Sequence, residues 1–363
     1  MDGNVIGTIA MNKKRIYGLE IFRILAAVGV LCYYYFFIGV IQGFYSKDVF
    51  IEFAFWGEFG VDIFFLISGF VIFLSTTNRT PLQFIGSRAK RIYPIFLLCS
   101  LFTLITGLMM PDTLPFDLLY RWLNSLTFFN DLWGMPPLSS IYWTLMVEVK
   151  FYILIAIVMK IEKSMGERAR GYRYQLLIGW LIVSLLNSYW WNNDLLAIIL
   201  NTKYAGHFSF GILCYLMYRG ENTKQQLCIA ILSIWLIFLN FINYTNWIRG
   251  IYTGVTYNDV EIFLAVLTLV VCFWLSVYVD SISIKIQRLI ICLSTLSYPF
   301  FLIHADLGYF IRTQYYLNIN NIPLAVIRLI NEKIIMVIAI LTSFAMACFS
   351  NRLVKKISEH VSP

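Results

Sequence analysis

Charged side chains inside apolar runs are the residues of this sequence whose chemistry most needs explaining. Arg23 and Glu148 each lie within a long apolar stretch, where a charged side chain costs about 2.5–3.5 kcal/mol on insertion scales. Lys150 is two residues from Glu148 and points elsewhere on a helix, so Glu148 needs a partner on another helix or a water-filled cavity. Intramembrane charges of this kind mark substrate paths and proton relays. For Arg23 the alternative is that it reaches the cytoplasmic interface.

Other polar residues lie in or beside the apolar runs. Arg88 and Arg91 are three residues apart, share a helix face, and have the geometry to clamp a phosphate-bearing ligand. The alternative for this pair is ordinary positive charge at the cytoplasmic side. Ser68 precedes Gly69 in the middle of an apolar run, where close helix packing is the alternative to a ligand contact. His304 lies near the outer end of its run.

The composition indicates that lipid surrounds these side chains. Of 363 residues, 60% are apolar and 13% charged, and the mean hydropathy is +0.73. A soluble domain has roughly half apolar and a quarter charged residues. The net charge of +8 does not indicate nucleic acid, because the basic residues lie in short turns between apolar stretches. The seven cysteines lie in or beside apolar runs without metal-ligand spacing, so we expect no metal.

Apolar segments long enough to cross a bilayer recur along the whole chain. A bilayer core of about 30 Å needs about 20 apolar residues per helix. The sequence predicts one polytopic domain over residues 1–363, an all-α integral membrane protein with about ten transmembrane helices. The expected spans are 17–42, 58–77, 92–111, 140–159, 174–190, 195–218, 226–243, 261–279, 289–309 and 334–350.

The distribution of lysine and arginine gives this topology a direction. With the N-terminus inside, 19 of these residues fall in the N-terminal tail, inside loops and C-terminal tail, six fall in outside loops and three within spans. This asymmetry follows the positive-inside rule, so we expect both termini to be cytoplasmic. The polar segment before the first run lacks the pattern of a signal peptide, and we expect that run to be a retained anchor.

In their order along the chain, the motifs resemble those of the membrane acyltransferase-3 family. The resemblance covers roughly residues 17–310 and rests on five groups of residues. They are Arg23 with Ala26-Ala27; Gly60-Val61-Asp62-Ile63-Phe64-Phe65 with Ser68-Gly69-Phe70; Arg88-x-x-Arg91-Ile92-Tyr93-Pro94; Tyr142-Trp143-Thr144-Leu145 with Glu148 and Phe151-Tyr152; and Ser297-Tyr298 with Leu302 and His304.

The resemblance implies a multi-pass enzyme of the bacterial inner (cytoplasmic) membrane. Such an O-acyltransferase moves an acyl group, most often acetyl, from cytoplasmic acetyl-CoA to a hydroxyl of a carbohydrate or lipid-linked glycan. The acceptors are O-antigen, capsule, exopolysaccharide or similar polysaccharides, and the resemblance is to stand-alone members without a fused soluble domain. It assigns Arg88 and Arg91, with Ser68, to the acyl-CoA donor, and Arg23 to catalysis. Glu148 and His304 are expected to position the acceptor or relay protons.

One position departs from the family pattern. The family places a catalytic histidine eleven residues after the arginine, and here that residue is Tyr34. Eleven helical steps put Arg23 and Tyr34 on one face about 16 Å apart. An imidazole with a reference pKa of about 6.5 accepts a proton readily, whereas a phenol at about 10 stays protonated at neutral pH. Tyr34 therefore leaves open a relative that binds acyl-CoA without efficient turnover. A transporter or flippase-like carrier is a second alternative, in which Glu148, Arg23 and Lys203 line a translocation path.

Overall fold

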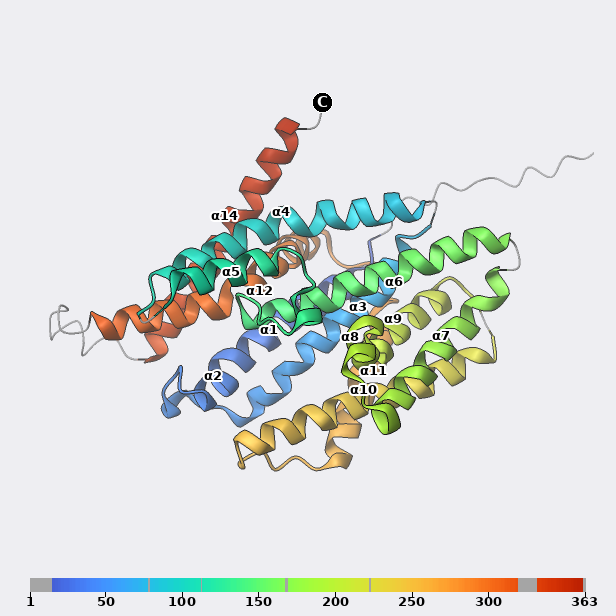
Figure 1. Cartoon of the computed structure of the whole chain (residues 1–363), viewed down its shortest axis with the longest axis horizontal. Helices are drawn as coiled ribbons and strands as arrows, with labels where there is room; N and C mark the ends of the chain where they lie inside the picture. Colours follow the sequence, from blue (N-terminus) through green and yellow to red (C-terminus); the bar gives the residue numbers. More distant parts are fainter. Residues whose placement is uncertain are drawn as a thin grey trace, which may run out of the picture.

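The computed structural model describes residues 15–77, 79–111, 113–166, 169–221, 223–318 and 332–361, and the regular structure in these ranges is helical (Figure 1). The predicted all-α class is confirmed. The longer helices are α1 (Tyr17–Tyr33), α3 (Phe59–Leu74), α4 (Pro81–Leu108), α5 (Pro115–Ser125), α6 (Trp143–Met165), α7 (Ala169–Leu186), α9 (Ala205–Tyr218), α10 (Gln225–Ile251), α11 (Asp259–Ser276), α12 (Ile284–Leu317) and α14 (Glu332–Val361). The short helices α2 (Gly39–Ile41) and α8 (Asp194–Leu200) complete the labelled set.

Seven helical stretches in the described residues are long and apolar enough to cross a membrane. They are Tyr17–Ile41, Glu52–Leu74, Pro81–Leu108, Gln225–Ile251, Asp259–Ser276, Ile284–Leu317 and Lys333–Lys356. Helices α6, α7 and α9 occupy the other three predicted spans, but α6 carries several charges and α9 has only 14 residues. The chain is therefore a multi-pass membrane protein, and the count of ten spans and the cytoplasmic termini stay predictions.

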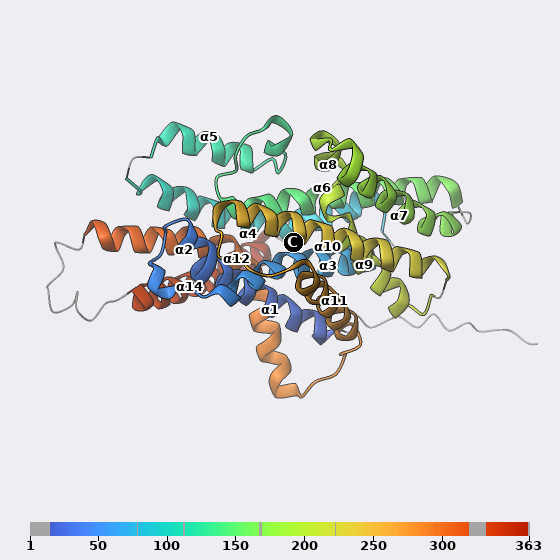
Figure 2. The ribbon, with the colours of Figure 1, turned by 90° about the horizontal axis from the view of Figure 1, so that it is seen from below.

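Most of the long helices run side by side along the longest axis of the molecule (Figure 1). Large apolar side chains such as Leu101, Ile157 and Leu264 are exposed on their outer surfaces, as expected where lipid is the solvent. Helix α12 bends, and its first part runs across the direction of its second part (Figure 2). It contains Pro299, whose missing N–H and ring bulk kink a helix.

Small residues let α3 and α9 approach closely. These two helices pack against each other, and a Cβ atom on Gly211 would overlap the carbonyl oxygen of Leu66. A Cβ on Gly69 would likewise overlap the carbonyl oxygen of Phe208. Only glycine fits at such a contact, so the close-packing interpretation of the Ser68-Gly69 pair is correct for the glycine.

The sixth predicted span is wrong as a single helix. The structure interrupts residues 195–218 at Asn201, whose φ of 50° is left-handed. Asparagine tolerates this conformation, and its side-chain Nδ2 donates to the carbonyl oxygen of Val147 at 2.8 Å. A short 3₁₀ turn, Thr202–Tyr204, then leads into α9. A further helix, α5, lies between the predicted spans 92–111 and 140–159, and α12 extends beyond its predicted end to Leu317.

Candidate functional site

Glu148 on α6 is held by two hydroxyl groups. Ser68 of α3 donates its hydroxyl to Glu148 Oε1 at 2.9 Å, and Tyr152, one turn further along α6, donates to the same oxygen at 2.5 Å. The sequence predicted a partner on another helix, and Ser68 provides it. Lys150 instead forms an ion pair with Asp131, so it does not neutralise Glu148. The carboxylate is thus oriented by neutral donors, which leaves its charge available to neighbouring cations.

Two arginines, Arg23 and Arg88, interact electrostatically with this carboxylate, and Arg91 interacts with both of them. The Nη1 of Arg23 is also 2.9 Å from Glu20 Oε2. The structure therefore brings together Arg23 from α1, Arg88 and Arg91 from α4, and Ser68 and Glu148, which the sequence placed in separate motifs. We call Arg23, Ser68, Arg88, Arg91 and Glu148 the arginine cluster.

Arg88 has unused hydrogen-bonding capacity. Its side chain is 8% exposed, and its guanidinium carbon lies 5.7 Å from the centre of the Phe84 ring. Nε and Nη1 are buried without a hydrogen-bonding partner among the described residues. A buried charged donor without a partner is costly, so these two N–H groups are poised to bind an anionic ligand. Arg91, by contrast, is exposed at the surface.

Tyr34 and His304 form a second group. Tyr34 begins a π-helical turn, Tyr34–Ile38, that follows α1, and such turns are frequent at functional sites. The centres of the Tyr34 and His304 rings are 5.4 Å apart in an edge-to-face arrangement. The neighbouring Tyr35 donates its hydroxyl to the backbone carbonyl of His304 at 2.8 Å, which fixes α12 against this turn.

The hydrogen bonding of His304 defines its tautomer. Its Nδ1 is 2.9 Å from the carbonyl oxygen of Phe301, and the side chain is 1% exposed. Because a carbonyl only accepts, Nδ1 carries the proton in the neutral ring. Nε2 then holds a lone pair, and it has no hydrogen-bonding partner among the described residues. This is the arrangement of a neutral imidazole that is ready to accept a proton.

The predicted catalytic residues thus divide between two places. Arg23 and Glu148 belong to the arginine cluster, whereas Tyr34, in the turn that follows α1, lies against His304 of α12. In the part of the chain that the structure describes, no hydrogen bond or ring contact joins the two groups. The rise of α1 separates them by about 16 Å. A substrate that reaches both must be extended.

Asp62 is a residue whose surroundings the sequence did not reveal. Its side chain is buried at 5% exposure, and its Oδ1 lies 2.6 Å from Nε2 of the fully buried His207. The sequence showed an aspartate in the second predicted span and a histidine in the sixth. Only the packing of α3 against α9 shows that the two side chains are in contact.

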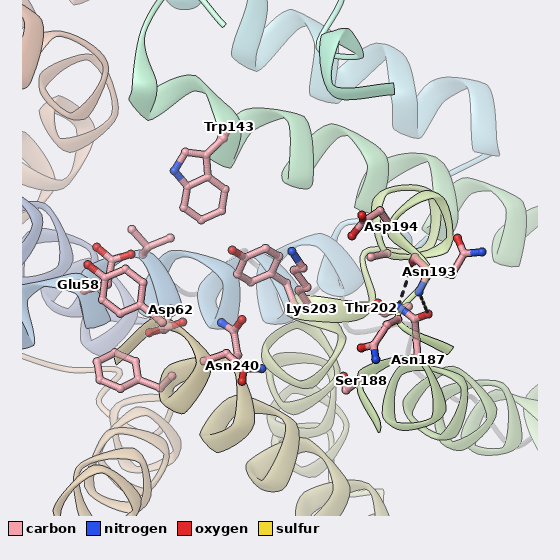
Figure 3. Close-up of a pocket in the computed structure, with 17 residues that line it drawn as sticks. Glu58, Asp62, Trp143, Asn187, Ser188, Asn193, Asp194, Thr202, Lys203 and Asn240 are labelled. Carbon is pink, nitrogen blue, oxygen red and sulfur yellow. Dashed lines mark hydrogen bonds between the residues drawn. The ribbon is translucent and has the colours of Figure 1, made fainter. Parts of the chain in front are cut away.

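A cavity of about 430 Å³ adjoins this pair (Figure 3). Residues from α3, α6 and α10 line it, together with the segment from Asn187 to Tyr204 that contains the break at Asn201. Its polar lining is rich in asparagine, which sequence reasoning did not single out. The available signal was asparagine within or beside apolar segments, as at Asn187, Asn240 and Asn243.

The family model of the acyltransferase-3 domain matches residues 16–350, nearly the whole chain. The chain belongs to this acyltransferase family. It is therefore a multi-pass membrane protein of an enzyme class that transfers acyl groups. Exopolysaccharide production protein ExoZ of Rhizobium meliloti (strain 1021) is 34% identical over 115 residues, which cover 28% of this chain and 33% of that protein. The aligned region is thus about a third of the relative's length. No solved structure matches the chain.

Proposed function

We propose that the protein is an O-acyltransferase of the bacterial inner membrane. It takes an acyl group, most simply acetyl, from cytoplasmic acyl-CoA and adds it to a hydroxyl of a cell-envelope polysaccharide or its lipid-linked precursor. The observation that carries this proposal is the family match across residues 16–350. The likeness to a protein named for exopolysaccharide production supports a polysaccharide as the acceptor.

The arginine cluster supports an acyl-CoA donor. Coenzyme A carries several phosphate groups, and a guanidinium binds phosphate oxygens through paired N–H groups. Arg88 has two buried N–H groups without a partner among the described residues, and Arg91 lies one turn away on α4. Ser68 and Glu148 border the same place, where Glu148 balances the excess of positive charge. In this proposal the cluster binds the donor and aims its long thioester arm along α1.

The chemistry requires a base at the far end of that arm. A sugar hydroxyl oxygen attacks the thioester carbonyl carbon, so that a C–O bond forms and the C–S bond breaks. The hydroxyl proton passes to the base and then to the departing sulfur of coenzyme A, which leaves as the free thiol. His304 Nε2 is an available proton acceptor, and Tyr34 lies against its ring. In this proposal Arg23 guides the thioester towards His304 and Tyr34. Glu148 helps to orient the Arg23 guanidinium through their electrostatic interaction.

Mass spectrometry of the host's envelope glycan, with and without the gene, tests this function. Cells that carry the gene should show glycan repeats heavier by one acetyl group, and purified protein in lipid nanodiscs should release free coenzyme A when the unmodified glycan is added. Identical glycan masses with no thiol release would overturn the proposal. Glycan that reaches the cell surface only when the gene is present, without added acyl groups, would instead establish the carrier alternative.

A further inference from the structure

The asparagine-lined cavity has the composition of a site for hydroxyl-rich ligands. The half-buried Asn240 and the exposed Asn243, both on α10, line it, and neither side-chain amide has a hydrogen-bonding partner among the described residues. Each side-chain amide offers both donors and an acceptor, and hydroxyl groups need both. Asn187 and Asn193 line another part of the cavity. Asn187 Nδ2 donates to the Asn193 carbonyl and to the Thr202 hydroxyl, and Asn187 Oδ1 accepts from the Asn193 backbone N–H (Figure 3). The site therefore combines free amides with a rigid polar wall.

Aromatic rings complete the cavity. Trp143 and Tyr204 both line it, and their rings stack with centres 5.4 Å apart at 30°. Figure 3 shows Trp143 on one side of the cavity and Asn240 on the other. Sugar rings have an apolar C–H face and hydroxyl edges, so an aromatic wall opposite amide groups matches both surfaces. A volume of about 430 Å³ lies within the range of small-molecule sites, roughly 300–1,000 Å³.

The charges lining the cavity favour an uncharged ligand. Three carboxyl side chains, Glu58, Asp62 and Asp194, face it, against one ammonium group, that of Lys203. Asp62 is tied to His207, so Glu58 and Asp194 remain to accept hydrogen bonds from hydroxyl groups. An acidic sugar or a phosphate would meet these carboxylates as like charges. A neutral sugar would meet only acceptors and donors that suit it.

Side-chain contacts connect the wall of the cavity to Tyr34. Tyr244 lines it and shares a hydrogen bond between hydroxyl groups with Tyr33. The Tyr33 ring lies edge-to-face on that of Tyr34, with centres 5.5 Å apart. Glu58, on the cavity wall, interacts electrostatically with Tyr34. The wall of the cavity is thus two side-chain contacts from the residue that replaces the expected histidine.

We propose that this cavity is the acceptor site and that it binds an uncharged sugar unit of the glycan, with one hydroxyl directed towards Tyr34 and His304. The direction of the hydroxyl rests on the proposed acyl transfer, whereas the binding of a neutral sugar does not. Donor and acceptor then enter at different places, the donor at the arginine cluster and the acceptor beside α10.

Sugar binding can be measured separately from acyl transfer. The full chain is placed in lipid nanodiscs, because the sugar heads of maltoside detergents would compete. Saturation-transfer NMR then follows cellobiose, lactose and neutral oligosaccharides from the host's own envelope glycan, with glucuronic acid as the anionic counterpart of glucose. The variants are Asn240→Leu, Asn243→Leu and their double mutant. Asn246→Leu is the matched control, because it lies on the same helix outside the cavity and bonds to Arg249.

We expect each cavity variant to weaken binding of the neutral sugar by up to about tenfold, the worth of one or two lost hydrogen bonds. The control should bind like the parent, and all variants should bind acyl-CoA normally. Unchanged sugar binding in the double mutant, tighter binding of glucuronic acid than of glucose, or no binding of any neutral sugar by the parent would each overturn the acceptor site. If the cavity variants weaken sugar binding while the parent shows no acyl transfer, the site stands and the proposed function fails. If the double mutant instead transfers acyl groups to the host glycan with an unchanged KM for the glycan, the proposed function stands and the acceptor site fails.

Discussion

At the scale of single residues, partners decide what each polar group is able to do. Glu148 accepts hydrogen bonds from Ser68 and Tyr152 at Oε1, which fix the orientation of its carboxylate. Arg88 and His304 are the opposite case, because each keeps buried nitrogen atoms without a partner among the described residues. Folding leaves such groups unsatisfied only at a cost of about 1–3 kcal/mol each. A ligand that satisfies them recovers that cost, so we expect substrates to bind at these two residues.

Replacing Arg88 or Arg91 with alanine should weaken acyl-CoA binding. Each guanidinium contributes charge-assisted hydrogen bonds to phosphate worth about 1.5–3 kcal/mol, so we expect a loss of roughly ten- to a hundredfold in donor affinity. Lysine should rescue only part of it, since an ammonium cannot form the paired bonds of a guanidinium. Isothermal titration of the protein in nanodiscs with acetyl-CoA measures the effect.

Lys90→Ala is the matched control for these arginines, because it removes the same charge from an exposed position on the same helix. It should bind acetyl-CoA like the parent. Normal donor affinity in both arginine variants would reduce Arg88 and Arg91 to determinants of membrane topology. An equal loss in Lys90→Ala would mean that the overall positive charge, and not the cluster, attracts the donor.

Restoring histidine at position 34 should accelerate acyl transfer. A phenol stays protonated at neutral pH, whereas an imidazole accepts a proton, and a well-placed base contributes about 10²–10⁴-fold. We therefore expect Tyr34→His to raise kcat within that range while donor affinity stays nearly constant. Steady-state release of coenzyme A in the presence of glycan gives both values. His304→Gln in the parent should remove most of the residual activity, because it deletes the available Nε2 lone pair.

The behaviour of Tyr34→Phe separates the remaining possibilities. If Tyr34→Phe transfers acyl groups as well as the parent and Tyr34→His gains nothing, the side chain only packs against His304. The base is then His304, His207 or Glu148. If Tyr34→His abolishes transfer that the parent performs well, the tyrosine itself has a catalytic role, and the expected gain is wrong.

At the scale of helices, the sequence predicted local features better than contacts. Hydrophobic length indicated helices at all ten spans, and the isolation of Glu148 from Lys150 correctly indicated a partner elsewhere. Asn201, Lys203 and His207 interrupt the apolar run of the sixth span and made it the weakest prediction, but they did not show that the helix breaks at Asn201. The Asp62–His207 pair depends on how α3 meets α9. Contacts between helices that are distant in sequence depend on tertiary packing, and the hydrophobic periodicity of the sequence does not predict them.

The contact between α3 and α9 should be intolerant of any larger residue at Gly211. A leucine side chain there would collide with the backbone at Leu66, and overpacking costs about 1–3 kcal/mol or more. We expect Gly211→Leu to lower the Tm in nanodiscs and to loosen the Asp62–His207 pair. Gly179→Leu on α7 is the control, since a Cβ there meets nothing within 4 Å. It should leave the Tm unchanged or slightly higher, because leucine favours helix. Equal melting of both variants would contradict the close contact.

At the scale of the whole molecule, the proposed donor site requires a particular orientation of the chain in the membrane. Three segments predicted to be cytoplasmic adjoin the start of α4, the end of α6 and the start of α10, which lie towards the right-hand end in Figure 1. Helix α2 and the start of α5, beside segments predicted to be outside, lie at the left-hand end. Arg88 and Arg91 follow the first of the cytoplasmic segments. An acyl-CoA that exists only in the cytoplasm can reach them only if this end faces inward. The orientation of the chain is therefore a condition of the proposed donor site.

Reporter fusions test that orientation directly. With 19 lysines and arginines assigned to inside segments and six to outside loops, the positive-inside rule places both termini in the cytoplasm. A reporter that works only in the cytoplasm should be active when fused after Pro363, and alkaline phosphatase, which needs an oxidising compartment, should be active when inserted after Thr113. This insertion point leaves intact the ion pair between Asp131 and Lys150. Alkaline phosphatase activity at residue 363 would mean an odd number of spans. If phosphatase is inactive after residue 113 but active after residue 79, Arg88 and Arg91 lie on the outer side of the membrane. They then cannot bind a donor from the cytoplasm.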